Sequence, residues 1–515
     1  MNTRSGQWTV LLGLLILQTL AHAQQPNPSP CSGPNGSRFN LEPRPNAVVQ
    51  AAQSVAFLRS RASHGADLVL ATATDMRAIT GVSFDAFYVQ RSSPNCKPDL
   101  EGELPIISNS FDSEFVPNGT PIALADPARD AFFIADIRFG AFTDASGVGI
   151  LRATAKQLLN KTACPAGTQS HGSAGCFTAA AVFNIVPLNT FLSSPQIAVD
   201  QRTKGTGAGD VYAVVTENDH NTGKTSISLM ACTNADLNCS TTTALLSENN
   251  RNVDFSSVGV RPDGTITIAY RSTTFPGINP EDIKFVTCKP NGAPAAPTCS
   301  APMLVAHEKT PDFDSFVGAT VLDAPYPVHT NRTEKDGKVT TFIVYDRCEA
   351  PVLQFAISIA GFCPKTDVAI TSSSDGGHTW SPVTKVTDSK GQQFFGMIAT
   401  DASTGTVNLA YYSTENDPGR QEHVQVFLAQ IAPGTTTVGK PQLLTSAFAD
   451  PHADPPTFVL FQPNGLGDRL GLAAAGTGTS GQSHAYVTFT WNSVFGTYNG
   501  VPSVDTNNHF AAFKY

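Results

Sequence analysis

The amino-acid sequence predicts an all-β fold of many short strands joined by tight turns. Charged residues make up only 15% of the 515 residues, whereas Gly (41) and Pro (36) are plentiful, and this composition favours strands and turns over helices. Alternating apolar runs rich in Val, Ile and Thr recur along the chain between turn residues. The same order of strand and turn repeats at a spacing of roughly 60 to 80 residues.

Each repeat consists of an apolar run, a turn, and a second run that ends in polar or charged residues. The first copy is 51–58 with 66–71, and the fourth is 257–264 with 265–270. The other copies are 121–126 with 131–136, 195–200 with 210–215, 316–322 with 341–345, 396–401 with 406–412, and 470–475 with 485–491. A further hairpin lies between most of these pairs, so each unit has enough strands for a four-stranded antiparallel sheet.

These units are compatible with a closed β-propeller or with a pair of β-sandwiches. In a propeller, radially stacked sheets bury one another's faces and leave only short edges, whereas alternating strands alone also fit sandwiches. The repeat order favours a propeller of four-stranded antiparallel blades, formed as one domain by residues 49–515. Seven copies favour seven blades, and six blades are the alternative. We expect the segment 24–48 to complete the last blade, to which 508–515 contributes a late strand.

One turn of the fifth unit has a specific sequence, Ser-Ser-Asp-Gly-Gly-His-Thr-Trp, at residues 373–380. Its Asp can accept hydrogen bonds from turn N–H groups, its second Gly can supply a positive φ, and its Trp can pack beneath the loop. The turn resembles the Asp box of sialidase-type (BNR-repeat) β-propellers through Ser373, Asp375, Gly377, Thr379 and Trp380. An ordinary hairpin turn containing Asp-Gly is the alternative.

The resemblance to the sialidase superfamily implies a fold that hosts hydrolases, lyases and binding modules. Sialidases clamp a substrate carboxylate with three arginines, use a Tyr activated by a Glu as nucleophile, and use an Asp as general acid and base. The positions of this sequence that can be assigned to these roles are Arg138, Arg271 and Arg347 for the clamp, Tyr412 with Glu415 for the nucleophile, and Asp136 for the acid. The Phe-Arg-Ile-Pro motif of such enzymes is absent, and only one full Asp box is present.

Polar side chains follow the second strand of nearly every unit. They are Asp136, Arg138, Glu217, Asp219, Arg271, Asp346, Arg347, Tyr412, Glu415, Trp491 and Asn492. Ligands of propellers usually meet strand ends around the central channel, where carboxylates and arginines can grip an anionic or polyhydroxylated molecule. The alternative is that these are solvated turn residues whose surface ion pairs contribute little.

The N-terminus has the pattern of a secretory signal peptide. Arg4 is followed by the apolar run 8–20 and by Ala21-His22-Ala23, which is a charged region, an apolar region and a small-x-small cleavage site. We therefore exclude residues 1–23 from the fold and expect a secreted or periplasmic protein. No later segment has the roughly 20 apolar residues of a membrane span, and a net charge of -9 argues against nucleic-acid or anionic-membrane partners.

The ten cysteines of an exported chain indicate disulfides. The local spacing predicts Cys164–Cys176, Cys232–Cys239, Cys288–Cys299 and Cys348–Cys363, which leaves Cys31 with Cys96. Metal binding by these cysteines is the weaker alternative, because no CxxC pair or histidine cluster accompanies them. In the third and fourth units, Cys232 and Cys288 occupy the place that the Asp box has in the fifth, so we expect a disulfide to replace the box there. No cofactor is expected, and a structural calcium is left open.

The sequence therefore predicts an exported, monomeric propeller that binds an extracellular glycan or protein. The alternative is an exo-acting glycosidase of the sialidase type. An enzyme requires three arginines that converge on one point beside a Tyr–Glu hydrogen bond, whereas in a binding protein these side chains scatter or pair off. A third interpretation is that Trp491 and Tyr412 form a platform on which a sugar stacks without being hydrolysed.

Overall fold

The computed structural model of the protein describes most of the chain between residues 37 and 514. The described residues are 37–40, 50–60, 62, 67–75, 84–91, 100–108, 114–117, 119–141, 143–164, 172–187, 189–240, 244–274, 281–308, 314–316, 319–321, 326–349, 365–417, 419, 423–445, 448–450, 469–476, 483–498 and 501–514. The expected signal peptide, Cys31, Cys96 and Cys363 lie outside the described residues, and the side chains of Trp491 and Asn492 are not described.

The strands of the first half of the chain form three antiparallel sheets. Sheet 1 contains β2 (Gln50–Arg59), β3 (Asp67–Asp75), β4 (Phe84–Arg91) and β5 (Leu100–Glu103). Sheet 2 contains β6 (Ile107–Ser108), β7 (Glu114–Pro117), β8 (Ile122–Asp126), β9 (Ala131–Gly140), β10 (Ala145–Thr154) and β11 (Ala179–Pro187). Sheet 3 contains β12 (Thr190–Val199), β13 (Val211–Asp219), β14 (Lys224–Cys232) and β15 (Ala244–Leu246).

Four further sheets follow in the second half. Sheet 4 contains β16 (Arg251–Val260), β17 (Ile266–Thr274), β18 (Glu281–Lys289), β19 (Thr298–Cys299) and β20 (Met303–Glu308). Sheet 5 contains β23 (Val328–Thr333), β24 (Val339–Cys348), β25 (Thr366–Ser373) and β26 (Thr384–Lys385), and sheet 6 contains β27 (Gln393–Thr400), β28 (Val407–Ser413), β29 (Gln425–Ile431) and β30 (Gln442–Leu443). Sheet 7 contains β31 (Gly471–Gly476), β32 (Ser483–Tyr498), β33 (Val501–Lys514) and β1 (Ser37–Asn40).

Little else is regular among the described residues. A small hairpin joins β21 (Asp314–Phe316) to β22 (Ala319–Val321), and helix α1 (Ala155–Leu158) and the 3₁₀ helix η1 (Gly172–Cys176) lie between β10 and β11. No helix of the described residues is long and apolar enough to cross a membrane.

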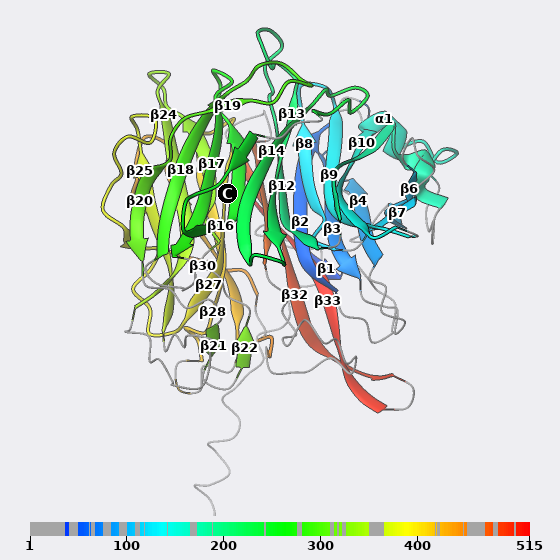
Figure 1. Ribbon diagram of the computed structural model, residues 1–515. Coiled ribbons are helices and arrows are strands. Elements are labelled where there is room, and N and C mark those ends of the chain that lie inside the picture. Colours follow the sequence, from blue (N-terminus) through cyan, green and yellow to red (C-terminus); the bar gives the residue numbers. More distant parts are fainter. Residues whose placement is uncertain are drawn as a thin grey trace, which may run out of the picture.

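The first strands of the seven sheets lie side by side in a closed ring. β2 packs against β8, β8 against β12, β12 against β16, β16 against β23, β23 against β27, β27 against β31, and β31 against β2. β1 pairs with β33, so the two ends of the chain share sheet 7 (Figure 1). The protein is thus a β-propeller of mostly four-stranded antiparallel sheets, as the sequence predicts. The described residues hold seven such sheets, the number of repeats counted in the sequence.

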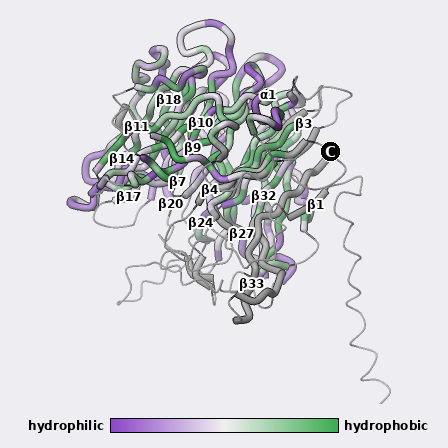
Figure 2. The backbone as a smooth tube through the Cα atoms, turned by 90° about the vertical axis from the view of Figure 1, so that its right-hand side faces the viewer, coloured by the Kyte–Doolittle hydropathy of each residue, from purple (hydrophilic) through white to green (hydrophobic). Residues whose placement is uncertain are grey.

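The core is divided into layers between neighbouring sheets. Successive side chains of a strand point to opposite faces, so β9 sends Phe132 and Ile134 toward sheet 1 and Phe133 and Ile137 toward sheet 3. Equivalent buried layers lie between sheets 3 and 4, 4 and 5, 5 and 6, and 6 and 7. Figure 2 shows the resulting pattern of hydrophobic strands and hydrophilic loops.

The ring has two faces, which we call the far face and the site face. On the far face the first strand of each sheet turns into the second. On the site face the second strand ends and the chain enters the first strand of the next sheet. The long hairpin of β32 and β33 projects from the site face, toward the bottom of Figure 1.

The turn at residues 373–380, which we call the Asp box for its resemblance, lies on the far face, between the third and fourth strands of sheet 5. Asp375 Oδ1 accepts hydrogen bonds from Ser373 Oγ (2.8 Å) and the Thr379 amide (3.0 Å). The Thr379 hydroxyl donates a further hydrogen bond, to Asp375 Oδ2. Together these bonds lower the pKa of Asp375, and the bond from the Thr379 hydroxyl has the largest effect. Gly377 has φ 97°, and a Cβ atom there would lie 2.6 Å from Phe285 of sheet 4. Trp380 packs edge-on against the same ring at 5.3 Å, so the box stabilises the boundary between two sheets.

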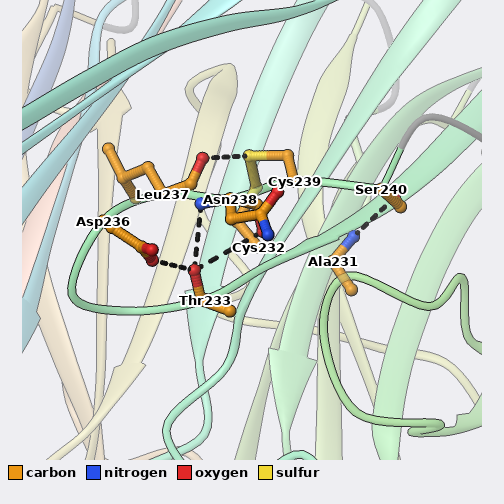
Figure 3. The surroundings of a disulfide bond; sticks show 8 residues. All are labelled: Ala231, Cys232, Thr233, Asp236, Leu237, Asn238, Cys239 and Ser240. Atoms are coloured by element: carbon orange, nitrogen blue, oxygen red, sulfur yellow. Dashed lines mark hydrogen bonds between the residues drawn. A yellow bond between two sulfur atoms is a disulfide. The ribbon is translucent and has the colours of Figure 1, made fainter.

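Disulfides hold the corresponding turns of the two preceding sheets. Cys232 is bonded to Cys239 in sheet 3, and Cys288 to Cys299 in sheet 4. The first of these turns also has an internal hydrogen bond from the Asn238 amide to Thr233 Oγ1 (2.9 Å) (Figure 3). The expected replacement of the Asp box by a disulfide is therefore seen in both sheets.

Two other predicted pairs involve described cysteines. Cys164 is bonded to Cys176 beside α1 and η1. Cys348 is disulfide-bonded as well, and Cys363, its predicted partner, lies outside the described residues.

Three arginines link neighbouring sheets across the far face; we call Arg129, Arg202 and Arg332 the staple arginines. Arg129 Nη2 donates to the carbonyl of Arg202 (2.9 Å), in the next sheet. Arg202 Nη1 donates to the carbonyl of Asp263 (2.7 Å), one sheet further. Arg332 Nη2 donates to the carbonyl of Thr435 (2.7 Å) in sheet 6. Charge-assisted hydrogen bonds of this kind are stronger than neutral ones, so they add to the hydrophobic layers between sheets.

Candidate functional site

The first strands are irregular where they leave the site face. The register with the second strand shifts between Ser193 and Gln196 in sheet 3, between Asp254 and Ser257 in sheet 4, and between Phe394 and Met397 in sheet 6. Residues at equivalent places have left-handed backbone angles, namely Thr120 (φ 55°), Ser194 (φ 53°), Phe255 (φ 47°) and Phe395 (φ 55°). A positive φ is unfavourable for such residues, and strain of this kind is concentrated at functional sites. These strained residues therefore point to the centre of the site face as the candidate site.

The preceding sheet holds some of these bulges in place. Asp346, at the end of β24, accepts hydrogen bonds from the amides of Phe395 (2.7 Å) and Gly396 (3.3 Å) in sheet 6. Thr74, at the end of β3, accepts one from the amide of Thr120 (3.0 Å) in sheet 2. Asp346, which the sequence places among the candidate ligand-binding residues, therefore contacts the backbone of the next sheet.

Side chains from four sheets meet at the centre of the site face. Tyr326, in the segment before β23, accepts a hydrogen bond from Gln196 Nε2 of sheet 3 (3.2 Å). Its ring centroid lies 5.3 Å from that of Phe255 of sheet 4. The guanidinium of Arg469, just before β31 of sheet 7, lies 5.6 Å from the Tyr326 centroid. Sheet 5 is a neighbour of neither sheet 3 nor sheet 7, so these contacts cross the ring axis. We call these four residues the axial cluster.

Arg271 connects the axial cluster to the boundary between sheets 4 and 5. Its guanidinium lies 4.7 Å from the Phe255 ring centroid. It binds Asp254 through two bonds, Nε to Oδ1 (2.7 Å) and Nη2 to Oδ2 (2.9 Å), and reaches Glu281 Oε1 at 3.2 Å. The two bonds to Asp254 form a bidentate pair, which fixes the plane of the guanidinium. Arg271 is thus a rigid support for the Phe255 ring.

Arg138 and Asp136 lie elsewhere, buried between sheets 1 and 2. Arg138 Nε binds Asp136 Oδ1 (2.8 Å), and Arg138 Nη1 donates to the carbonyl of Pro105 (2.7 Å). Burial raises the pKa of Asp136 to about 6, although the charge of Arg138 opposes this shift. This ion pair serves the packing of two sheets.

Arg347 pairs with a third carboxylate. Its Nε lies 3.1 Å from Glu308 Oε2, and Tyr345 donates to Glu308 Oε1 (2.6 Å). Burial and, secondly, the charge of Glu308 raise the pKa of Tyr345. Tyr345 therefore stays protonated at neutral pH, in contrast to an activated tyrosine nucleophile.

Tyr412 is buried in the core between sheets 6 and 7, where its ring stacks on Phe394 with a centroid distance of 5.5 Å. Glu415 accepts a hydrogen bond from Ser413 Oγ (3.5 Å), and partial burial raises its pKa. Burial raises the pKa of the neighbouring Tyr411, and the negative charge of Glu415 raises it further.

The structure thus distributes the six catalytic candidates over several boundaries between sheets. Each of the three arginines has a different carboxylate partner: Asp136 for Arg138, Asp254 for Arg271, and Glu308 for Arg347. Of the six, only Arg271 contacts the axial cluster through the interactions described above. Glu217 and Asp219 lie on the site face in sheet 3, where they bond to Asn184 and to the 219–222 turn. Within the described residues, no group of three or more His, Cys, Asp or Glu side chains is placed to hold a metal ion.

Gln196, Phe255, Tyr326 and Arg469 are not among the site residues predicted from the sequence. The predicted residues come near the ends of second strands, whereas Tyr326 and Arg469 precede first strands, and Gln196 and Phe255 lie in or beside bulges. A polar or aromatic residue immediately before or early in a first strand would have been a signal for these four residues. The start of a first strand, like the end of a second strand, lies near the axis of a propeller.

No protein-family model matches the chain, and no curated protein matches its sequence. Among solved structures, the fold is similar to a Hadza microbial sialidase, with 9% identity and a TM-score of 0.41, over 87% of this chain and 76% of that one. It is also similar to the Penicillium chrysogenum alpha-L-arabinanase (10% identity, TM-score 0.40, 76% and 98% covered). The GH93 alpha-L-arabinofuranosidase of Fusarium graminearum is a further match (10% identity, TM-score 0.41, 77% and 97% covered). At these TM-scores the likenesses carry no inference about activity.

Proposed function

We propose that the protein is an exported propeller that binds an extracellular glycan at the axial cluster without cleaving it. The observation that carries this proposal is the meeting of Gln196, Phe255, Tyr326 and Arg469 from four sheets at the centre of the site face. Aromatic ring faces and convergent polar donors are the usual lining of small-ligand sites. The C–H groups of a sugar suit the negative face of an aromatic ring, and its hydroxyls suit amide and guanidinium donors.

The contacts among the described residues do not include the arginine clamp and the activated tyrosine that a sialidase-type glycosidase requires. Its clamp requires three arginines directed at one carboxylate, whereas Arg138, Arg271 and Arg347 bind carboxylates of the protein itself. Its nucleophile requires a tyrosine that substrate can reach beside a glutamate, whereas Tyr412 is buried in the core between sheets 6 and 7 and stacks on Phe394. Both features support a binding function.

A glycan-binding screen of the purified protein tests the proposal. We expect Tyr326→Ala and Arg469→Gln each to lower the affinity for the glycan that binds best by at least tenfold. The matched control is Arg261→Gln, because Arg261 also lies over an aromatic ring, Phe285, at 5.7 Å, but on the far face. Equal losses in all three variants, or no binding by the unmodified protein, would contradict the proposal.

Hydrolysis of a fluorogenic sialoside separates the two functions. We expect no turnover by the unmodified protein. Turnover that disappears in both Arg271→Ala and Tyr412→Phe would establish the glycosidase and the roles assigned to these residues by resemblance.

A further inference from the structure

A second group of aromatic side chains lies on the site face, at the boundary between sheets 2 and 3. The ring centroids of Phe139 and Phe191 are 6.4 Å apart, and those of Phe191 and His220 are also 6.4 Å apart. Phe191 is 43% exposed, and His220 beside it is exposed as well. Contiguous exposed apolar groups on a folded protein mark interaction sites more often than isolated ones do. We call Phe139, Phe191 and His220 the aromatic shelf.

The backbone beneath the shelf is held in an unusual conformation. The register of β10 with β11 shifts between Ser146 and Val148, and Asn184 in this bulge has φ 50°. Asn184 Nδ2 donates to Glu217 Oε1 of sheet 3 (2.7 Å). Glu217 also accepts a hydrogen bond from Ser228. A bulge re-aims the side chains of its strand, and here a hydrogen-bonded carboxylate of sheet 3 maintains it at the boundary between sheets 2 and 3.

The charge around the shelf restricts what can bind there. Glu217 lies under the bulge, and Asp219 accepts hydrogen bonds from the Asn221 amide and the Thr222 hydroxyl, both at 2.9 Å. Two carboxylates beside an apolar surface disfavour an anionic partner. The exposed Asn221 and Lys224 at the same turn offer polar groups to hydroxyls. The shelf therefore suits a neutral molecule with both C–H and hydroxyl groups.

The shelf and the axial cluster are connected by a single strand. Phe191 and Gln196 both belong to β12 and are five positions apart, which corresponds to roughly 15 Å along an extended strand. A monosaccharide at the axial cluster does not span this distance, whereas an oligosaccharide does.

We propose that the aromatic shelf is a second contact site for the glycan bound at the axial cluster, and that the natural ligand is a neutral polysaccharide chain. This inference rests on the proposed function. Phe191 and His220 stack on successive sugar units, while the axial cluster holds the other end of the bound segment. Affinity therefore rises with chain length until both sites are occupied, because the second contact is made within one complex.

The test is binding of the full-length protein to malto-, cello-, xylo- and manno-oligosaccharides of one to eight units, measured by calorimetry. We expect an affinity that rises at least tenfold between the shortest and the longest binding members of a series. Phe191→Ala removes this gain and leaves the affinity for the shortest member unchanged. The matched control is Phe448→Ala, because Phe448 is 41% exposed and also lies beside a histidine, His423 at 5.8 Å, but in sheet 6.

The outcomes separate the two proposals. If short members bind and neither chain length nor Phe191→Ala changes the affinity, the shelf is no glycan contact, although the axial cluster still is. If Phe448→Ala acts like Phe191→Ala, the effect is not specific to the shelf and the inference is overturned. If no member binds, the proposed function and this inference both fail. A dimer in sedimentation that Phe191→Ala dissolves would overturn the inference in favour of a second copy of the chain.

Discussion

The two faces of the ring use charged and strained groups in different ways. On the far face, the staple arginines and the Asp box satisfy backbone and carboxylate groups of neighbouring turns. The residues with positive φ in the Asp box turn are glycines, Gly376 and Gly377. On the site face, serine, threonine and phenylalanine occupy left-handed conformations in or beside the bulges of the first strands, and the axial cluster brings polar and aromatic groups together.

This difference shows how the propeller separates stability from recognition. The far face joins each sheet to the next with bonds that lie within the protein. Costly left-handed conformations occur on both faces, with Asp130 and Leu237 as examples on the far face. On the site face they lie at the bulges of the first strands, and this face also exposes groups such as Phe191. Variants of the far face are therefore expected to change the free energy of unfolding, and variants of the site face to change binding.

The largest effect is expected for Arg202→Met on the far face. The carboxylate of Asp200 is fully buried and lies 2.6 Å from Arg202 Nη2, whose side chain is 25% exposed. Removing one partner leaves a buried charge, which costs about 3 kcal/mol. Urea denaturation should show this loss in the free energy of unfolding.

The control for this variant is Lys338→Met, which breaks an ion pair with Asp336 on the surface, where the two side chains are 73% and 56% exposed. This change should leave the urea midpoint unaltered, since exposed pairs contribute little. Equal midpoints for the two variants would mean that the staple arginines are no more important than surface charges.

A somewhat smaller effect is expected for the double variant Cys232→Ala, Cys239→Ala. The disulfide closes a loop with a sequence separation of 7 residues, and the chain-entropy model assigns such a loop about 2.5 kcal/mol. Hydrogen exchange should become faster in residues 231–240 of the turn, while the axial cluster keeps its affinity for glycan. A loss of affinity at a temperature where the variant is folded would show that the two faces are coupled.

The ion pair of Asp136 makes stability depend on pH. Burial raises the pKa of Asp136 from 3.8 to about 6 in the folded protein, so the folded state binds this proton more tightly than the unfolded state. The resulting stabilisation is complete below pH 3.8 and is lost as the pH rises through about 6. Between pH 4.5 and pH 7.5 the loss is about 2 kcal/mol.

Asp136→Asn isolates this contribution because it removes the titrating group and keeps the side-chain shape. The difference in free energy of unfolding between the unmodified protein and this variant should fall as the pH rises from 4.5 to 7.5. A difference that stays constant would show that Asp136 is ionised in the folded protein throughout this range.

The sequence predicted the fold from features that repeat. Alternating runs, turn residues and cysteine spacing are local features of the sequence. They were therefore sufficient to predict the paired strands of each sheet, the Asp box hydrogen bonds and the turns at Cys232 and Cys288. The staple arginines could not be predicted in this way, because Arg202 binds a carbonyl 61 positions away, and no local pattern contains that partner.

The candidate site was predicted less well for the same reason. The sequence identified Arg138, Arg271 and Arg347 because they were expected to follow second strands, whereas the structure places them inside β9, β17 and β24, near the end of each strand. For Arg271 and Arg347 the sequence contained no sign of a carboxylate partner, because Asp254 is 17 positions from Arg271 and Glu308 is in a different sheet from Arg347. Tyr326 and Arg469 are 143 positions apart in the sequence (469 − 326) and meet only because the ring closes.

The smallest effect, and the one of opposite sign, is expected at Ser194. This residue is buried with φ 53° in the bulge of β12, a conformation that costs a non-glycine residue roughly 1 to 2 kcal/mol. Glycine removes this cost but loses more conformational entropy on folding, by roughly 0.5 to 1 kcal/mol. Ser194→Gly should therefore stabilise the protein by about 0.5 kcal/mol, detectable as a higher urea midpoint.

The matched control is Gly264→Ala on the far face, where φ is 88° and a Cβ atom would lie 1.8 Å from Arg202 Nη2. It should lower the urea midpoint, because the substitution adds strain and displaces a staple arginine. Stabilisation by Ser194→Gly together with weaker glycan binding would show that the bulge is kept strained because the strained form positions Gln196. Destabilisation by Ser194→Gly would instead place Ser194 among the residues that hold the fold together, and the separation of the two faces would then not hold in sheet 3.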